Sequence, residues 1–343
     1  YDEAQMVAWP AQLAAKVGVP FTLPLVQDPG CPPPLLSPLV LDAALVGVFR
    51  ALGGSGDIVA ALGGVCAPLQ PGVTLPTNDV AISGANVHDA LYETPQIAAT
   101  ISPGEGAMYS RVLLPGETQV TAMLAQSPTF VSVEMATNEI LPASSGLLAL
   151  VTPYARWQPA YDSLVADVAS TGAGSVLVGL PRSAADFPSV RTAREFFSQW
   201  PYLLGLGIQV SISCYFSPNY LFVPGYLLSL LARAPTTATC ADVPGAVDYV
   251  LTPSDVSAVN ALMAQMNVHM QAQATARGYA YFDLSVLYDL PKIPFNMGGV
   301  LFSSQPFGPY MSIDGVHPNA AGQAILAQAA ANAIQATYHV TIP

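Results

Sequence analysis

The stretch FVSVEMATNE, residues Phe130–Glu139, decides the fold class of this chain. Its first part, with Thr129 before it, is a short run of apolar and small side chains, which predicts a β-strand over Thr129–Glu134. The run is followed closely by Asn138. Open α/β sheets place their functional groups just beyond the carboxyl ends of their strands. Asn138 is therefore a candidate site residue, and the chain is expected to be an α/β protein.

A second stretch, DVAISGANV (Asp79–Val87), has the same form. It predicts a short strand over Val80–Ser83, a glycine turn at Gly84 and a helix that begins at Val87. Gly84 would then lie just past the carboxyl end of a strand, where open α/β sheets build their sites.

Strands and helices alternate along the rest of the chain. Helices are predicted at Trp9–Val17, Gln119–Leu124, Trp157–Thr171, Asp255–Ala276 and Ala320–Tyr338, and further strands at Ser175–Leu180 and Tyr279–Asp283. This alternation favours a parallel sheet with helices on both faces. No linker divides residues 1–343, so we expect one domain.

A proline-rich region around residues 20–75 interrupts this pattern. Its first part, Pro20–Pro38, is expected to be a surface excursion. The segments Leu39–Leu52 and Ile58–Leu62 fit either an apolar hairpin or a cap near the site. This region could shape an acyl pocket, although the sequence does not give the length of an acyl chain.

The strongest chemical signal is SIDGVHPN, Ser312–Asn319. Asp314 precedes His317 by three residues on a turn, so its carboxylate can accept the imidazole Nδ1–H and leave Nε2 free as a base. Pro318 restricts the turn because it fixes its own φ and limits the residue before it. A polar loop with an incidental histidine is the alternative. Of the other histidines, His269 is expected to lie on the surface.

In order and spacing, these three segments resemble the SGNH/GDSL hydrolases over nearly the whole chain. Gly84 matches the glycine of the family's second block, Asn138 the asparagine of its third, and Asp314 with His317 its last block. The resemblance implies a flavodoxin-like α/β/α sandwich of three layers and a serine-type ester hydrolase. His317 would be the base, Asp314 its partner, and Gly84 and Asn138 the oxyanion donors, with no metal or cofactor. Ala136 and Glu139 stand where the family's Gly-x-Asn-Asp has glycine and aspartate, so the turn before Asn138 lacks the family's glycine.

The nucleophile of that family is a serine in a Gly-Asp-Ser-Leu block, and residues 1–8 contain no serine. We expect this serine to lie before Tyr1. Ser83 is an unlikely substitute, because it sits at the oxyanion turn and lacks the Gly-x-Ser-x-Gly form of a nucleophile elbow. A non-catalytic protein that binds an acyl chain or glycan, and an acyltransferase, are the alternative functions.

Composition limits the partners. The net charge is −12, from 10 Lys and Arg against 22 Asp and Glu, which argues against nucleic acid. Hydrophobic residues make up 52% of the chain and the mean hydropathy is +0.44. No run of apolar residues reaches the roughly 18–20 that a transmembrane helix needs. A small-molecule, lipid or glycan ester is the expected substrate class.

Four cysteines group by sequence into Cys31 with Cys66 and Cys214 with Cys240. No Cys-x-x-Cys or Cys/His spacing suggests zinc. We expect two disulfides, with free buried thiols as the alternative, and hence an extracytoplasmic protein: secreted, periplasmic or a lipoprotein. A lipoprotein would associate with the membrane peripherally, through an anchor at the N-terminus.

Overall fold

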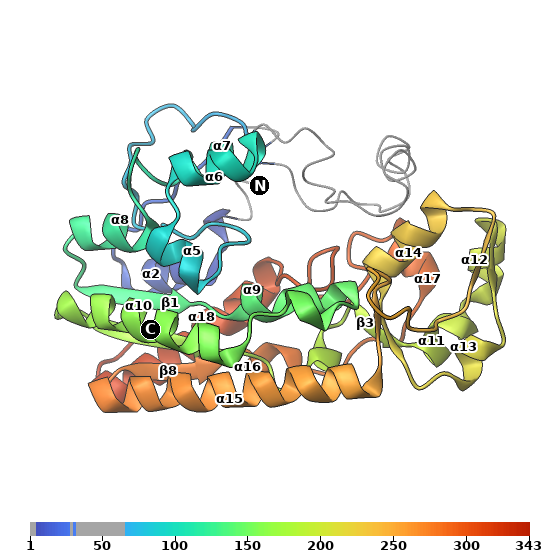
Figure 1. Ribbon diagram of the computed structural model, residues 1–343. Helices are drawn as coiled ribbons and strands as arrows, with labels where there is room; N and C mark the ends of the chain where they lie inside the picture. Colours follow the sequence, from blue (N-terminus) through green and yellow to red (C-terminus); the bar gives the residue numbers. More distant parts are fainter. Residues whose placement is uncertain (1–4, 28–29, 32–65) are drawn as a thin grey trace.

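The computed structural model describes residues 5–27, 30–31 and 66–343. Its central element is a parallel sheet of three strands in the order β1-β2-β8 (Figure 1). The strands are β1 (Phe130–Glu134), β2 (Gly174–Gly179) and β8 (Ala280–Asp283). Their register aligns Leu177 of β2 with Val133 on one side and Tyr281 on the other. The predicted mixed α/β fold with a parallel sheet is confirmed.

Side chains of β2 alternate between two hydrophobic clusters. Val176 and Val178 pack in a cluster that includes Leu326 of α18, whereas Leu177 packs in a cluster that includes Met263 of α15. A strand that is buried on both faces reads as a continuous apolar run, which is why β2 could be predicted from sequence. The long helices that contribute to these clusters are α2 (Trp9–Val17), α10 (Tyr154–Ser170), α15 (Pro253–Arg277) and α18 (Ala320–Tyr338).

Local signals set the ends of these helices. Thr252 and Asp255 form a capping box at the start of α15, Pro253 follows the cap, and Gly278 ends the helix in the left-handed conformation at φ +66°. Asn319 caps α18 by accepting the N–H groups of Ala321 and Gly322.

A second group of elements, residues 190–251, lies between β2 and α15 in the chain and was not expected from the sequence. It occupies the right-hand end of Figure 1. The antiparallel strands β3 (Val190–Thr192), β5 (Tyr220–Phe222) and β7 (Val250–Leu251) form one sheet, and the parallel strands β4 (Ile208–Val210) and β6 (Thr236–Ala238) form another. Its helices are α11 (Ala193–Ser198), α12 (Trp200–Gly205), α13 (Ser213–Phe216) and α14 (Val223–Ala232).

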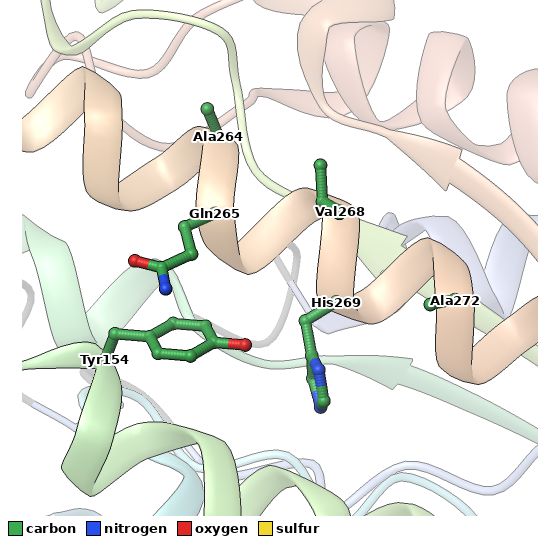
Figure 2. Close-up of a pocket in the computed structure, with 6 residues that line it drawn as sticks. All are labelled: Tyr154, Ala264, Gln265, Val268, His269 and Ala272. Carbon is green, nitrogen blue, oxygen red and sulfur yellow. The ribbon is translucent and has the colours of Figure 1, made fainter.

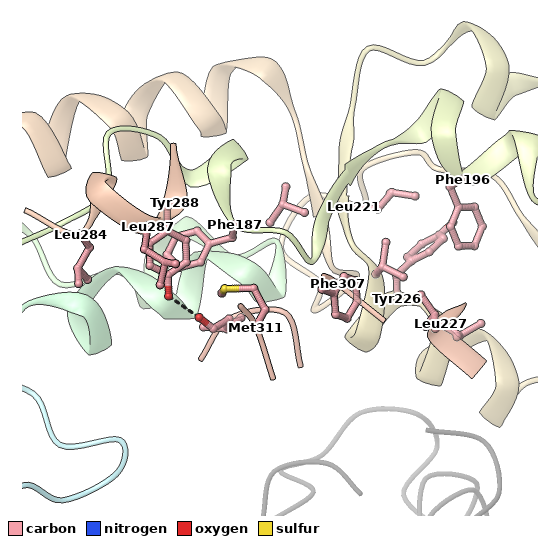
Figure 3. Close-up of a cluster of buried hydrophobic side chains, with 14 of the residues drawn as sticks. Phe187, Phe196, Leu221, Tyr226, Leu227, Leu284, Leu287, Tyr288, Phe307 and Met311 are labelled. Carbon is pink, nitrogen blue, oxygen red and sulfur yellow. Dashed lines mark hydrogen bonds between the residues drawn. The ribbon is translucent and has the colours of Figure 1, made fainter. Parts of the chain in front are cut away.

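One hydrophobic cluster joins this group to the parallel sheet. Figure 3 shows its side chains running from Leu284 and Tyr288, next to the sheet, through Phe307 to Tyr226 and Phe196. Aromatic rings contact each other along the way. The ring centroids of Phe187 and Tyr288 are 4.9 Å apart in a tilted pair, and those of Phe196 and Tyr226 are 5.2 Å apart in an edge-on pair. The shared core fixes the second group against the sheet.

Shorter helices complete the described chain. They are α5 (Val87–Tyr92), α6 (Pro95–Ile101), α7 (Pro103–Tyr109), α8 (Gln119–Ala125), α9 (Thr137–Ile140), α16 (Ser285–Tyr288) and α17 (Met297–Phe302), with 3-10 turns at Leu141–Ser145, Leu148–Leu150 and Ala184–Asp186. None of the described helices has the length and apolarity to cross a bilayer.

The predicted strand at Val80–Ser83 is wrong, because the segment forms no ladder with the described strands. Side chains hold its backbone instead. Asp79 Oδ1 accepts the Ala81 N–H at 2.9 Å, and Gln119 Nε2 donates to Val80 O at 2.9 Å. The local bond from Asp79 competes with strand pairing, and the bond from Gln119 occupies a carbonyl that a strand ladder would use.

Both predicted disulfides, Cys31–Cys66 and Cys214–Cys240, are confirmed. In the described part of the proline-rich region, Val26 and Leu69 pair in a single antiparallel bridge. The segments Leu39–Leu52 and Ile58–Leu62, and Pro32–Pro38, lie outside the described residues.

Candidate active site

Residues 312–318 form a tight turn that precedes α18. The Ser312 N–H donates to the His317 carbonyl at 2.8 Å, and Gly315 turns the chain at φ +64°. A Cβ at position 315 would lie only 2.6 Å from the Phe307 ring. Both the backbone conformation and the lack of space therefore require glycine here.

Within this turn, Asp314 holds the His317 ring. Asp314 Oδ2 lies 2.7 Å from His317 Nδ1, while Oδ1 accepts the Val316 N–H at 2.8 Å, the His317 N–H at 2.9 Å and the Ser312 hydroxyl at 2.6 Å. A carboxylate so occupied keeps a fixed orientation and places the imidazole proton on Nδ1. Nε2 is then an acceptor, on a side chain that remains 58% exposed.

Electrostatics favour a charged pair. The protein around the partly exposed ring displaces water and acts to lower the pKa of His317. The hydrogen bond and charge of Asp314 and the charge of Glu134 outweigh this effect, so the pKa is raised. For Asp314, burial acts to raise the pKa, and its bonds to His317 and Ser312 hold it below the usual value. The ring is thus more basic than a free imidazole, which suits a proton acceptor whose conjugate acid is stabilised.

Other elements anchor the turn from behind. The Ser189 backbone N–H and hydroxyl both donate to the Gly315 carbonyl, at 3.2 and 2.9 Å. The Tyr288 hydroxyl donates to the Val316 carbonyl. These bonds occupy consecutive carbonyls of the turn and fix its position against β3 and α16.

The Gly84 and Asn138 turns are also brought together. Asn138 Nδ2 donates to the Ala85 carbonyl at 2.8 Å, and Glu139 Oε1 accepts the Val87 N–H at 2.7 Å. Gly84 is exposed, at φ +82°, with no atom within 4 Å of the place where a Cβ would lie. The Asn138 amide keeps a second N–H beyond its bond to Ala85.

Glu134, at the carboxyl end of β1, lies near both the Asp314–His317 turn and the turns of Gly84 and Asn138. It accepts the Trp9 indole N–H at 2.6 Å, and its charge acts on His317, while Asn138 follows it by four residues. The Trp9 backbone N–H in turn donates to Gln323 Oε1 of α18 at 2.9 Å. The His317 turn and the Asn138 turn therefore lie around the same strand end, although no hydrogen bond among the described residues joins the two pairs directly.

Sequence reasoning missed Glu134, Trp9 and Ser189. Glu134 is accessible to solvent, but the protein around it displaces much of the water, and this desolvation raises the pKa of its carboxyl group. The hydrogen bond from Trp9 and the charge of His317 act to lower that pKa and only partly offset the effect. The Trp9–Glu134 contact spans 125 positions and the Ser189–Gly315 contact spans 126. Only a carboxylate at the end of an apolar strand could have drawn attention to Glu134 beforehand.

Ala136 occupies a conformation that suits glycine. Its φ is +116°, its side chain is buried, and it immediately precedes α9. A non-glycine residue at such a φ is strained by roughly 1–3 kcal/mol. Ala136 lies two residues before Asn138, and the SGNH/GDSL hydrolases that the sequence resembles have glycine at the position of Ala136.

Ala136→Gly is therefore expected to stabilise the protein, by roughly 0.5–1 kcal/mol after the loss of a buried methyl group. Ala98→Gly, at a fully buried helical alanine of α6, is the matched control and is expected to destabilise by roughly 1–2 kcal/mol. Urea unfolding measures both changes. A destabilised Ala136→Gly variant would contradict the assignment of strain.

Glu139 is a buried carboxyl group that joins the Gly84 and Asn138 turns. Oε1 accepts the Val87 N–H, whereas Oε2 has no hydrogen-bond partner among the described residues. Burial, opposed by the Val87 N–H and reinforced by Asp89, raises the pKa of Glu139 to about 7.

This pKa predicts a pH-dependent stability. Between the unfolded pKa of 4.5 and the folded pKa of about 7, the folded state holds a proton that the unfolded state has lost, so stability falls as pH rises through this window. Glu139→Gln removes this contribution, roughly 2–3 kcal/mol, while it keeps an acceptor for Val87. Urea unfolding at pH 5 and pH 8 should show a smaller loss in the variant than in the wild type. Equal losses would contradict the raised pKa.

His269 is less exposed than expected, because its side chain is only 15% exposed and pairs with Asp162 at 2.7 Å. Its ring packs edge-on against Trp157. Figure 2 shows His269 and Tyr154 at a surface pocket of about 440 Å³ between α10 and α15. No candidate site residue lines this pocket, and we interpret the pair as a contact between the two helices.

Comparisons of the chain with family models, with curated proteins and with solved structures found no match. Among the residues that the structure describes, no group of three or more His, Cys, Asp or Glu side chains could hold a metal ion.

Proposed function

We propose that the protein is a serine-type ester hydrolase with a three-layer, flavodoxin-like α/β/α fold of the SGNH/GDSL type. The observation that carries this proposal is the Asp314–His317 pair. Asp314 is fixed by four hydrogen bonds, and it holds an exposed imidazole whose Nε2 has no hydrogen-bond partner in the described part of the chain. A second support is the junction of the Gly84 and Asn138 turns near the same strand end.

The proposed reaction is acyl transfer to water. His317 Nε2 takes the proton of a serine hydroxyl as the serine oxygen bonds to the ester carbonyl carbon. The Gly84 N–H and the free Asn138 amide N–H stabilise the oxyanion, where one such donor contributes roughly 10²–10³ in rate. The intermediate then expels the alcohol, which receives the proton from His317. Water repeats the sequence on the acyl-enzyme and releases the acid.

The nucleophile is proposed to be a serine before Tyr1. Among the described residues, no serine hydroxyl is hydrogen-bonded to the His317 ring, and the hydroxyl of nearby Ser312 donates to Asp314. A lipid, glycan or small-molecule ester is the proposed substrate. The two disulfides support an extracytoplasmic location, because such bonds persist in oxidising compartments. Attachment to a membrane through an N-terminal anchor is part of the same proposal.

A fluorophosphonate probe tests this function on the protein expressed from its complete gene. The serine oxygen would displace fluoride from phosphorus and remain covalently labelled, and peptide mass spectrometry would locate it. We expect one labelled serine N-terminal to Tyr1, together with turnover of a short-chain aryl ester. Absence of both labelling and turnover in the folded protein would favour a non-catalytic binding protein, and labelling of Ser83 would overturn the assigned nucleophile.

A further inference from the structure

The far end of the second group of elements carries a continuous exposed apolar surface. We define the α12–α13 patch as Phe197, Trp200, Leu204, Tyr215 and Phe216. Trp200 is 50% exposed, Leu204 52% and Phe216 75%. Phe197, Trp200 and Leu204 line one groove of about 290 Å³, and the Phe197 ring contacts Tyr215, which contacts Phe216. The five side chains thus form one surface.

This surface is built on a fixed scaffold. The disulfide Cys214–Cys240 ties α13 to the chain beyond β6, and Cys214 is fully buried. Leu203 of α12 and Ile208 of β4 are fully buried beneath the patch elements. The apolar side chains are therefore exposed on packed elements, and an exposed patch of this kind on a folded protein marks an interaction site.

The charge pattern indicates the partner. Residues 196–232 contain no Asp, Glu, Lys, Arg or His, although the chain as a whole carries −12. Arg194 borders the patch, because its guanidinium lies over the Tyr215 ring at 4.7 Å and donates to the Tyr215 hydroxyl at 3.0 Å. The five patch side chains themselves carry no charge and cannot form ion pairs with a charged protein surface, whereas they match a lipid surface without net charge.

The side-chain types agree with this reading. Trp and Tyr combine an apolar ring with a polar group, and they concentrate where hydrocarbon meets water. The acidic net charge disfavours anionic membranes, which attract basic segments. From these observations we infer that the α12–α13 patch docks the protein on a neutral or zwitterionic lipid surface. This inference does not rest on the proposed ester hydrolysis.

Co-sedimentation of the full chain with phosphatidylcholine vesicles tests the inference without any hydrolysis. We expect the wild type to bind, with a blue shift of tryptophan fluorescence. Binding should be insensitive to salt, because the contact is apolar, and weaker to vesicles that contain phosphatidylserine. Trp200→Ser combined with Phe216→Ser is expected to reduce partitioning roughly tenfold or more.

The matched control is Ile101→Ser combined with Val268→Ser, which removes side chains that are 65% and 70% exposed elsewhere. It should bind vesicles like the wild type. Circular dichroism and thermal unfolding confirm that both double variants are folded. Failure of the wild type to bind vesicles, or equal binding by the patch variant, would overturn the inference. A wild type that is dimeric by light scattering, with a patch variant that is monomeric, would also overturn it, because the patch would then be an interface between two copies.

Discussion

Replacing His317 with alanine in the full-length protein is expected to reduce kcat for a short-chain aryl ester by roughly 10⁴–10⁶-fold. The variant loses the imidazole that Asp314 holds, and with it the proposed general base and the proposed proton donor to the leaving alcohol. Because His317 is 58% exposed, its removal leaves no buried cavity, and the fold should survive. Steady-state kinetics measure the loss, and circular dichroism checks the fold.

His88→Ala is the matched control. His88 is exposed at the start of α5, close to the Gly84 turn, and its ring contacts Tyr92. A histidine in the same region but outside the proposed machinery should leave kcat within a few-fold of the wild type. Wild-type turnover in His317→Ala would refute the assignment of the base.

The second large effect is expected from Asp314→Asn, which should lower kcat by roughly 10⁴-fold. An asparagine amide can present an N–H to His317 Nδ1, and this favours the tautomer with the proton on Nε2, where the base must be free. The change also removes the charge that raises the pKa of His317. The acidic limb of the pH profile of kcat/KM should therefore move to lower pH in the residual activity.

Ser312→Ala provides a graded comparison for this variant. It removes one of the four hydrogen bonds to Asp314 but keeps the carboxylate and both backbone donors. A loss of only a few-fold is expected, with a small shift of the same limb. A pH profile of Asp314→Asn identical to that of the wild type would contradict the proposed coupling.

Much of the fold could be predicted because its signals are local. The apolar run of β2, the capping box at Thr252 and the asparagine cap at Asn319 each specify an element within a few residues. The wrong strand at Val80–Ser83 has the opposite cause. Its backbone bonds to the side chain of Gln119, 39 positions away, and no pattern within the segment reveals that partner.

The same distinction applies to the candidate site. The Asp314–His317 contact spans three residues, so spacing alone could suggest it. Glu134 and Trp9 meet across 125 positions, and the second group of elements is made of strands of two or three residues that leave no periodicity to detect. These features depend on contacts between residues that are far apart in the chain, and local patterns in a single sequence do not predict such contacts.

A structure of the full-length protein with a covalently bound phosphonate would test the central claim most directly. The account predicts the phosphonyl oxygen about 3 Å from both the Gly84 nitrogen and Asn138 Nδ2, with His317 Nε2 facing the labelled serine oxygen. A phosphonate bound away from these groups, or a His317 ring that faces elsewhere while the serine is labelled, would contradict it.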